Sequence, residues 1–301
     1  MDRRRSLLAA SQTGGDFKPI IDINNYLTIE ALEDGLTASL SVNACEYCVD
    51  GDGNWIDLPA GTATESINAG QTLSFKISNS TATQEVGGLE DPGGPVSLDG
   101  PDGPDGPGGS GSIGTFSITK YCNLLGNVMS MIFGDDAANN TSLSGYNSVF
   151  ENLFYDCDTI KTVSNNFLPA TFLSSRCYCG MFQNCTSLTT APELPATTLA
   201  GSCYESMFKG CASLTSAPEL PATTLVSYCY NYMFIGCTKL NYIKMLATDI
   251  SAYSCLEYWV RNVSSTGTFV KNPAMTTLPT AKSSNRYIGI PRGWTVQNAT
   301  S

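Results

Sequence analysis

Histidine is absent from this chain of 301 residues. Without it, the chain cannot form the Ser-His-Asp or Cys-His pairs that activate a nucleophile, and zinc would have to be held without imidazole. Paired carboxylates of the glycosidase type remain, but Glu193 and Glu219 occupy equivalent places in two copies of a repeat. We interpret them as a surface row. We therefore expect no enzyme, no catalytic residue, no metal site and no cofactor.

Basic residues are scarce as well, with 16 Lys and Arg against 27 Asp and Glu and a net charge of −11. A surface that neutralises phosphates needs the opposite balance, so we expect no nucleic-acid partner. No apolar run approaches the roughly 18–20 residues that cross a bilayer, so we expect no membrane insertion. The N-terminus has a basic head, but the apolar stretch after it covers only residues 7–10. An export signal needs about 7–15 apolar residues, and we expect none here.

A repeated phrase dominates the second half of the chain. Cys-Tyr-x-x-Met-Phe-x-x-Cys stands at 177–185, 203–211 and 229–237, a step of 26 residues each time. A nine-residue phrase beginning Ala-Pro-Glu-Leu-Pro occurs at 191–199 and again at 217–225. A fixed period in this range predicts a solenoid, whose atypical end repeats cap the stack. Degenerate copies at 149–157 and 255–260 fit such ends.

Each repeat also predicts its own local structure. Leu199, Cys203 and Met207 are spaced four residues apart, which favours a short amphipathic helix, and Lys209-Gly210 is a typical helix stop. A short strand is expected at 214–217, ended by a proline. The fold class predicted is α+β: an N-terminal β-sandwich-like domain followed by a short leucine-rich-repeat solenoid with one strand and one short helix per 26-residue coil.

The chain contains 12 cysteines. A buried thiol behaves as a small hydrophobe, and a cysteine that recurs in every coil is most simply a core residue. We predict reduced packing thiols rather than a disulfide framework. Cys45 and Cys48 have the spacing of half a zinc or redox site, but the other half is not evident. Eight cysteines fall on two rows locked to the repeat: Cys177, Cys203, Cys229 and Cys255, and Cys157, Cys185, Cys211 and Cys237.

The first half divides by composition. Residues 1–22 are expected to form an N-terminal docking arm, 23–136 a β-sandwich domain of short alternating strands, 137–263 the solenoid and 264–301 a C-terminal cap. An acidic insert at 81–112 is rich in Gly, Pro and Asp and contains collagen-type triplets. It is interpreted either as a solvated loop or as a short trimer axis.

Residues 50–54, Asp-Gly-Asp-Gly-Asn, suggest a calcium loop. An EF-hand would require Gly at the sixth position and Glu at the twelfth, where this chain has Trp55 and Gly61. We interpret the segment instead as a tight hairpin turn with Trp55 packed over it.

The pattern Leu-x-x-Ala-Pro-x-Leu-Pro followed by Met-Phe-x-x-Cys-x-Ser-Leu resembles the leucine-rich repeats of surface antigens of gut and oral Bacteroidetes. The chain is more similar to proteins of crAss-like and other phages that infect gut Bacteroides. Those proteins share the basic opening at 1–5, the Ile-Glu-Ala-Leu-Glu-Asp-Gly-Leu pattern at 29–36 and the Gly-Ile-Pro-x-Gly-Trp-Thr-Val pattern at 289–296. The resemblance covers nearly the whole chain except the insert. It implies a virion fibre or tail-associated protein and supplies no catalytic residue.

The predicted binding surface is the outward-facing set of repeat side chains, which are mostly neutral. Hydroxyl and aromatic groups of this kind suit a glycan, because rings stack on sugars and hydroxyls share hydrogen bonds. They suit equally a packed subunit interface or a bland soluble surface. The candidate residues are Thr189, Thr190, Thr215, Ser216, Tyr228, Asn231 and Tyr232.

The predicted function is that of a phage virion fibre or decoration protein, a homotrimer. Arg3, Arg4 and Arg5 of its arm would dock to other virion proteins. Its repeats would adhere to a host-surface glycan or protein through weak, multivalent contacts. One alternative is a bacterial cell-surface leucine-rich-repeat adhesin, which would need an export signal. The other is a purely structural virion component whose repeats pack against a neighbour.

Overall fold

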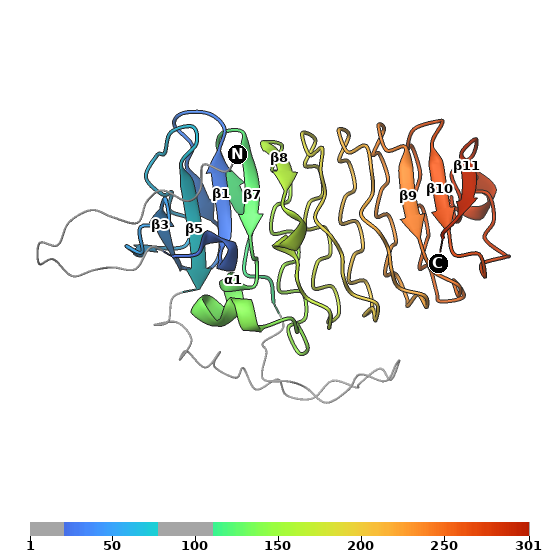
Figure 1. Ribbon diagram of the computed structural model, residues 1–301, viewed down its shortest axis with the longest axis horizontal. Helices are drawn as coiled ribbons and strands as arrows, with labels where there is room; N and C mark the ends of the chain where they lie inside the picture. The colour runs from blue at the N-terminus through green and yellow to red at the C-terminus, as the bar shows by residue number, and fades with distance from the viewer. Residues whose placement is uncertain (1–20, 78–110, 301) are drawn as a thin grey trace, which may run out of the picture.

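The computed structural model describes residues 21–77 and 111–300. The predicted docking residues Arg3, Arg4 and Arg5 and nearly all of the acidic insert lie outside these described residues. What is described consists mainly of strands and turns, with a few short helices. In Figure 1 the chain advances along one axis, from the sheet near the N-terminus, through parallel loops of backbone, to strands β9–β11.

A six-stranded sheet forms the N-terminal end, in the order β4-β3-β5-β1-β7-β8. All of its pairs are antiparallel except β7 with β8. Its alternating sequence places Leu27, Ile29 and Ala31 in the core, while Thr28 bonds Ser74 on the opposite face. The strands are β1 Leu27–Ala31, β3 Cys45–Val49, β4 Ile56–Leu58, β5 Thr72–Ile77, β7 Cys122–Gly126 and β8 Ile160–Val163.

A second, two-stranded sheet packs on the first. It pairs β2 (Ala38–Leu40) with β6 (Phe116–Ile118). The ring of Phe116 lies 5.2 Å from that of Phe75 in β5, so aromatic side chains join the two layers. The structure thus shows two sheets joined through their side chains, and the sandwich-like domain predicted for this region stays a prediction.

The loop between β3 and β4 contains the segment considered as a calcium loop. Asp50 has a left-handed φ of 51° and accepts hydrogen bonds from Thr72 N and Gln71 Nε2. Asp52 accepts one from Asn54 N. Since these carboxylates serve the turn and the neighbouring strand, the geometry is that of a hairpin turn. Trp55 packs against Tyr26, with ring centroids 5.0 Å apart.

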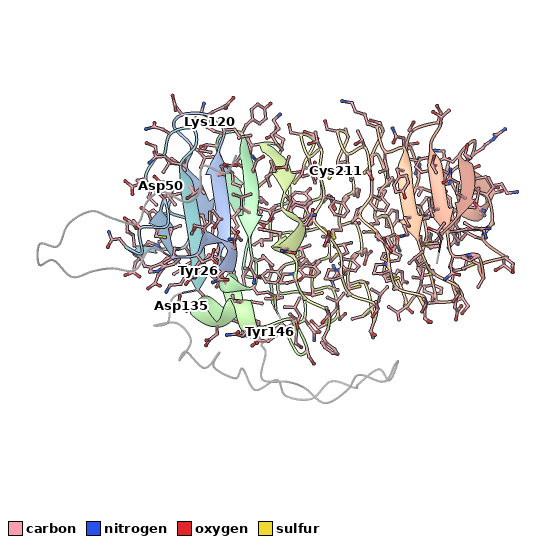
Figure 2. The ribbon with its side chains drawn as sticks, in the orientation of Figure 1. Tyr26, Asp50, Lys120, Asp135, Tyr146 and Cys211 are labelled. Atoms are coloured by element: carbon pink, nitrogen blue, oxygen red, sulfur yellow. The ribbon has the colours of Figure 1, made fainter. Side chains whose placement is uncertain are left out.

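One lysine is buried at this end of the molecule. Lys76 is 5% exposed, and its Nζ lies 3.0 Å from Asp135 Oδ1, 3.6 Å from Glu46 Oε2 and 4.4 Å from the ring centroid of Trp55. Tyr26 donates a hydrogen bond to the same Asp135 oxygen (Figure 2). The buried ammonium is thus fully partnered. Asp135 lies in η2 (Gly134–Asn139), which follows α1 (Ser130–Phe133).

The sheet continues without a break into the repeats. Strand β8 belongs to the first repeat, yet it pairs with β7 of the N-terminal domain. On the far side of the core, Ile113 and Phe116 donate backbone hydrogen bonds to the carbonyls of Val149 and Leu153. Both sheets are therefore hydrogen-bonded to the first repeat, and one hydrophobic core joins the two parts.

The predicted helix of each repeat is wrong. The structure has instead a ribbon of successive turns, here called the turn ribbon: residues 148–157, 176–185, 202–211, 228–237 and 254–262. In the ribbon at 202–211, Ser202, Ser206 and Gly210 have φ values of 54°, 56° and 78°. An α-helix cannot include left-handed residues at every fourth position.

Hydrogen bonding gives the physical reason for this outcome. Alternate N–H groups bond within the ribbon, as Met207 N does to Tyr204 O at 3.2 Å. The others bond to the next repeat, as Phe208 N does to Met233 O at 3.0 Å. Joining neighbouring repeats therefore satisfies donors that a helix would use internally. Because the ribbon repeats every four residues, it still turns Cys203 and Met207 inward.

The strand predicted at 214–217 is reduced to one bridge, Ser216 with Tyr242. Pro218 follows directly and has no N–H to donate to a ladder. The C-terminal segments have no proline at this place and form the parallel strands β9 (Tyr242–Met245), β10 (Thr268–Lys271) and β11 (Thr295–Asn298). Two single-turn helices, η3 (Asn165–Phe167) and η4 (Ser283–Asn285), lie in the connections.

Equivalent side chains of successive repeats lie over one another, as the period predicts. Phe154, Phe182, Phe208 and Phe234 form one stack with centroid spacings of 5.5, 5.8 and 5.8 Å. Phe116 of β6 extends this stack at 5.5 Å. A second stack comprises Phe150, Tyr178, Tyr204 and Tyr230. All these rings are buried, so the repeats share a continuous aromatic spine.

Candidate functional site

The predicted binding residues do not form a single surface. The strand side of the repeats contains the bridging segments at 188–191 and 214–217, and the turn ribbon lies across the core from it. The contact between Phe167, just after β8, and Phe182 of the ribbon, 6.4 Å apart, spans that core. Four predicted residues lie on the strand side and three in the ribbon.

Thr189, Thr190, Thr215 and Ser216 are all exposed on the strand side. Thr190 pairs with Thr162 of β8, and Ser216 pairs with Tyr242 of β9. The four residues occupy equivalent places in two successive repeats, and each pair adjoins a different strand. Asn123, in β7, accepts a hydrogen bond from the Thr162 hydroxyl at 2.7 Å.

Tyr228, Asn231 and Tyr232 lie in the turn ribbon, where Tyr228 and Tyr232 have φ values of 59° and 57°. Tyr228 is 36% exposed and meets Tyr253 of the next repeat edge to face at 5.4 Å. Asn231 is only 3% exposed, so its prediction as a surface contact is wrong. Asn231 lies between Tyr228 and Tyr232 in the ribbon. Its Oδ1 has no hydrogen-bond partner within the described residues.

Tyr232 has no free ring face. One face stacks on Tyr258 of the next repeat, with centroids 5.4 Å apart and planes within 7°. Lys209, from the preceding repeat, lies over the ring with Nζ 6.0 Å from the centroid. Because both faces are covered, Tyr232 presents its edge and hydroxyl outward. A sugar ring cannot stack on it without displacing a neighbour.

The tyrosines continue towards the C-terminus. Tyr258 lies 6.2 Å from Tyr287, and the guanidinium of Arg261 lies 6.0 and 5.8 Å from these two rings. Arg286 pairs with Glu257 at 3.3 Å. Our sequence reasoning missed Tyr258, Arg261 and Tyr287. Tyr258 stands one period after Tyr232, so the repeat itself was the signal, whereas Tyr287 lies beyond the repeats and gave none.

Partly buried carboxylates occupy the same ribbon. Arg176 Nη2 lies 2.6 Å from Glu151 Oε1, and Arg176 Nη1 lies 3.5 Å from Glu205 Oε2. Burial would raise the pKa of Glu151, but the hydrogen bonds from Arg176 and Ser148 and the charge of Arg176 outweigh it and lower that pKa. One arginine therefore ties three successive repeats together, which is a structural arrangement.

The thiols are set apart from solvent. All 12 cysteines are free and buried. Burial raises the pKa of Cys45, Cys122 and Cys157 to about 12, so these thiols stay protonated and unreactive. Cys45 and Cys48 are three residues apart in β3, which turns their side chains to opposite faces of the strand. They do not form half of a zinc site.

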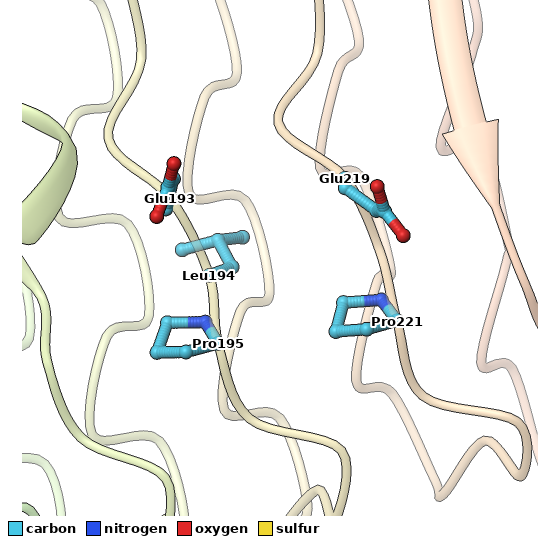
Figure 3. A pocket seen from close by; sticks show the side chains of 5 residues that line it. All are labelled: Glu193, Leu194, Pro195, Glu219 and Pro221. Atoms are coloured by element: carbon cyan, nitrogen blue, oxygen red, sulfur yellow. The ribbon is translucent and has the colours of Figure 1, made fainter.

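A shallow depression of about 270 Å³ lies on the outside of two repeats (Figure 3). It is lined by Glu193, Leu194, Pro195, Glu219 and Pro221, so equivalent positions of neighbouring coils form its walls. Glu219 pairs with Lys244 at 2.9 Å. Within residues 21–77 and 111–300, no group of three or more Cys, Asp or Glu side chains is arranged to hold a metal ion.

No helix in the described part of the chain is long and apolar enough to span a membrane. Comparisons with protein-family models, curated proteins and solved structures give no match. The candidate surfaces therefore rest on geometry alone: exposed hydroxyls at equivalent places on the strand side and a row of tyrosines with cations on the turn side.

Proposed function

We propose that this protein is a phage virion fibre or decoration protein whose repeats, a short solenoid of the leucine-rich-repeat kind, adhere to the host cell surface. The observation that carries the proposal is that inward and outward positions of each repeat hold different kinds of side chain. Inward positions form a rigid spine of stacked rings, whereas outward positions hold hydroxyl and phenol groups at regular intervals. A regular, rigid row of this kind suits repeated weak contacts with a polymer.

The architecture supports the same proposal. The sandwich-like domain closes one end of the repeats, and strands β9–β11 close the other. The side chains of the repeats supply no activated nucleophile, since the thiols are buried and protonated. In this proposal the N-terminal arm docks to other virion proteins, and the assembly is a homotrimer. A glycan is the proposed receptor class.

The proposal is tested with labelled full-length protein and gut Bacteroides cells. Saturable binding to cells is expected, and it should weaken when Tyr228 and Tyr253 are both replaced by Ser. Mass spectrometry and immunogold labelling of purified particles test the virion location. Normal adsorption with failed particle assembly would favour a structural component, and display on bacteria without phage would favour a surface adhesin.

A further inference from the structure

Charge is distributed very unevenly along the chain. Residues 237–301 contain seven Lys and Arg against two Asp and Glu, a formal charge of +5. Residues 1–236 contain nine Lys and Arg against 25 Asp and Glu, a formal charge of −16. The C-terminal end of an acidic protein is therefore locally basic, and such asymmetry indicates a charged partner.

Two cations on the turn side have no ion pair within the part of the chain that the structure describes. Lys209 and Arg261 stand two periods apart in one column of the ribbon, with Ile235 between them. Within residues 21–77 and 111–300, neither forms an ion pair with a carboxylate, and each lies instead against tyrosine rings. Arg261 is exposed. By contrast, Lys244 is paired with Glu219, and Lys271 donates to the backbone carbonyl of Met275.

We propose that a tyrosine–cation patch, formed by Lys209, Tyr232, Tyr258, Arg261 and Tyr287, binds a carboxylate-bearing polysaccharide. Arg286 lies beside it but is paired with Glu257. This inference rests on the adhesion function proposed above and names its ligand. A planar guanidinium forms paired hydrogen bonds with a carboxylate, and the guanidinium of Arg261 has no ion pair with any carboxylate of the described residues. The three tyrosines run along the axis of the repeats, as an extended polymer chain would.

The geometry argues against two other ligands. A neutral sugar or a nucleic-acid base would need an open ring face, but Tyr232 and Tyr258 cover each other and Lys209 lies over the other face of Tyr232. Nucleic acid also carries one charge every few ångströms, and the acidic remainder of the chain would repel it. A polysaccharide with sparse carboxylates needs only a few local cations.

The experiment uses folded full-length protein in affinity electrophoresis through gels containing polygalacturonate, dextran or single-stranded DNA. Retardation is expected in polygalacturonate and not in dextran. Arg261→Glu should weaken polygalacturonate binding at least about tenfold, as loss of a charge-assisted contact implies. Lys120→Glu makes the same change of net charge on an exposed residue between β6 and β7, at the opposite end of the molecule (Figure 2). It should leave binding nearly unchanged.

Equal weakening by the two variants, equal retardation in dextran, or stronger retardation by DNA would each overturn the proposal. If Arg261→Glu fails to fold, the test uses Arg261→Gln, which should also weaken binding, and the salt dependence of wild-type binding. A carboxylate contact must weaken as the salt concentration rises. Cell binding that survives Arg261→Glu would remove this ligand while leaving the adhesion function intact.

Discussion

The thiol of Cys211 donates a hydrogen bond to the backbone carbonyl of Phe182 in the preceding repeat, with Sγ and O 3.1 Å apart. The same bond recurs from Cys157 to Phe116, from Cys185 to Phe154 and from Cys237 to Phe208, at 3.0–3.1 Å. Each of these cysteines therefore both fills the core and fastens its repeat to the preceding segment. This explains why a weak donor with a small side chain stands at that place in four successive repeats.

Replacing this thiol tests its two roles. Cys211→Ala removes the donor and leaves a small void, and we expect it to lower the free energy of unfolding by about 1–2 kcal/mol. Cys211→Ser keeps a donor of similar size and should cost less than the alanine variant. Chemical denaturation followed by circular dichroism measures both. If the Cys211→Ala variant is as stable as the Cys211→Ser variant, the thiol acts through packing alone.

Thiol chemistry gives a second prediction. Because every cysteine is buried and burial raises the thiol pKa values, the native protein should react with Ellman's reagent only very slowly at pH 8. After denaturation all 12 thiols should react. The measurement is the absorbance of released thionitrobenzoate. Rapid reaction of even one thiol in the folded protein would contradict the burial described here.

The turn ribbon can be tested at two glycines in equivalent positions. Gly210 and Gly236 have φ values of 78° and 80°, so alanine is strained at both. A Cβ on Gly210 would also collide with Asn184 Oδ1, whose side-chain amide is bonded to Asp156, whereas one on Gly236 would meet only ordinary contacts near 3.6 Å. We expect Gly236→Ala to cost about 1–2 kcal/mol and Gly210→Ala about 1 kcal/mol more.

Denaturation midpoints of the two variants supply the comparison. Equal costs would mean that Asn184 moves aside freely. A negligible cost for both variants would be inconsistent with left-handed glycines, and hence with a turn ribbon in place of the helix.

The spine was predictable because it depends on repetition alone. Phe182, Phe208 and Phe234 recur every 26 residues, and stacking follows once equivalent positions lie over one another. The ribbon was not predictable from hydrophobic spacing. Cys203 and Met207 turn inward in the turn ribbon as they would in a helix, and Leu199 just before it is buried as well, so the spacing fits both structures.

The signals that separate ribbon from helix were weak in the sequence. Gly180, Gly210 and Gly236 stand at a left-handed position, but the same conformation occurs at Tyr228 and Tyr232, which rarely adopt it. Hydrogen bonds to the neighbouring repeats hold these residues there, as Tyr232 N does to Glu257 O. Such support is tertiary, and a single repeat does not reveal it.

The candidate surfaces were predictable only in part. Thr190 and Ser216 were expected to be exposed because they lie outside the apolar pattern, and they are. Asn231 follows the same reasoning and is buried, because the ribbon's left-handed residues shift which side chains face outward. The covering of Tyr232 by Lys209 and Tyr258 depends on the offset between repeats, which only the structure supplies.

The ion pair of Lys76 and Asp135 predicts an acid-sensitive contribution to stability. Burial raises the pKa of Asp135, but hydrogen bonds from Tyr26 and Lys76 and the charge of Lys76 lower it below the ordinary value of 3.8. Because the folded pKa is the lower one, this carboxylate stabilises the fold above pH 3.8, and the contribution is lost as the pH falls through the folded pKa.

The measurement is the free energy of unfolding of wild type and Asp135→Asn at several pH values between neutrality and strong acid. Other carboxylates also titrate in this range, so the prediction concerns the difference between the two proteins. That difference should favour the wild type near neutrality and shrink as the solution becomes strongly acidic. Asp136→Asn, a change of the exposed neighbour in η2, makes the same change of net charge and is the matched control. A constant difference for Asp135→Asn would mean that Asp135 stabilises Lys76 by packing and not by its charge.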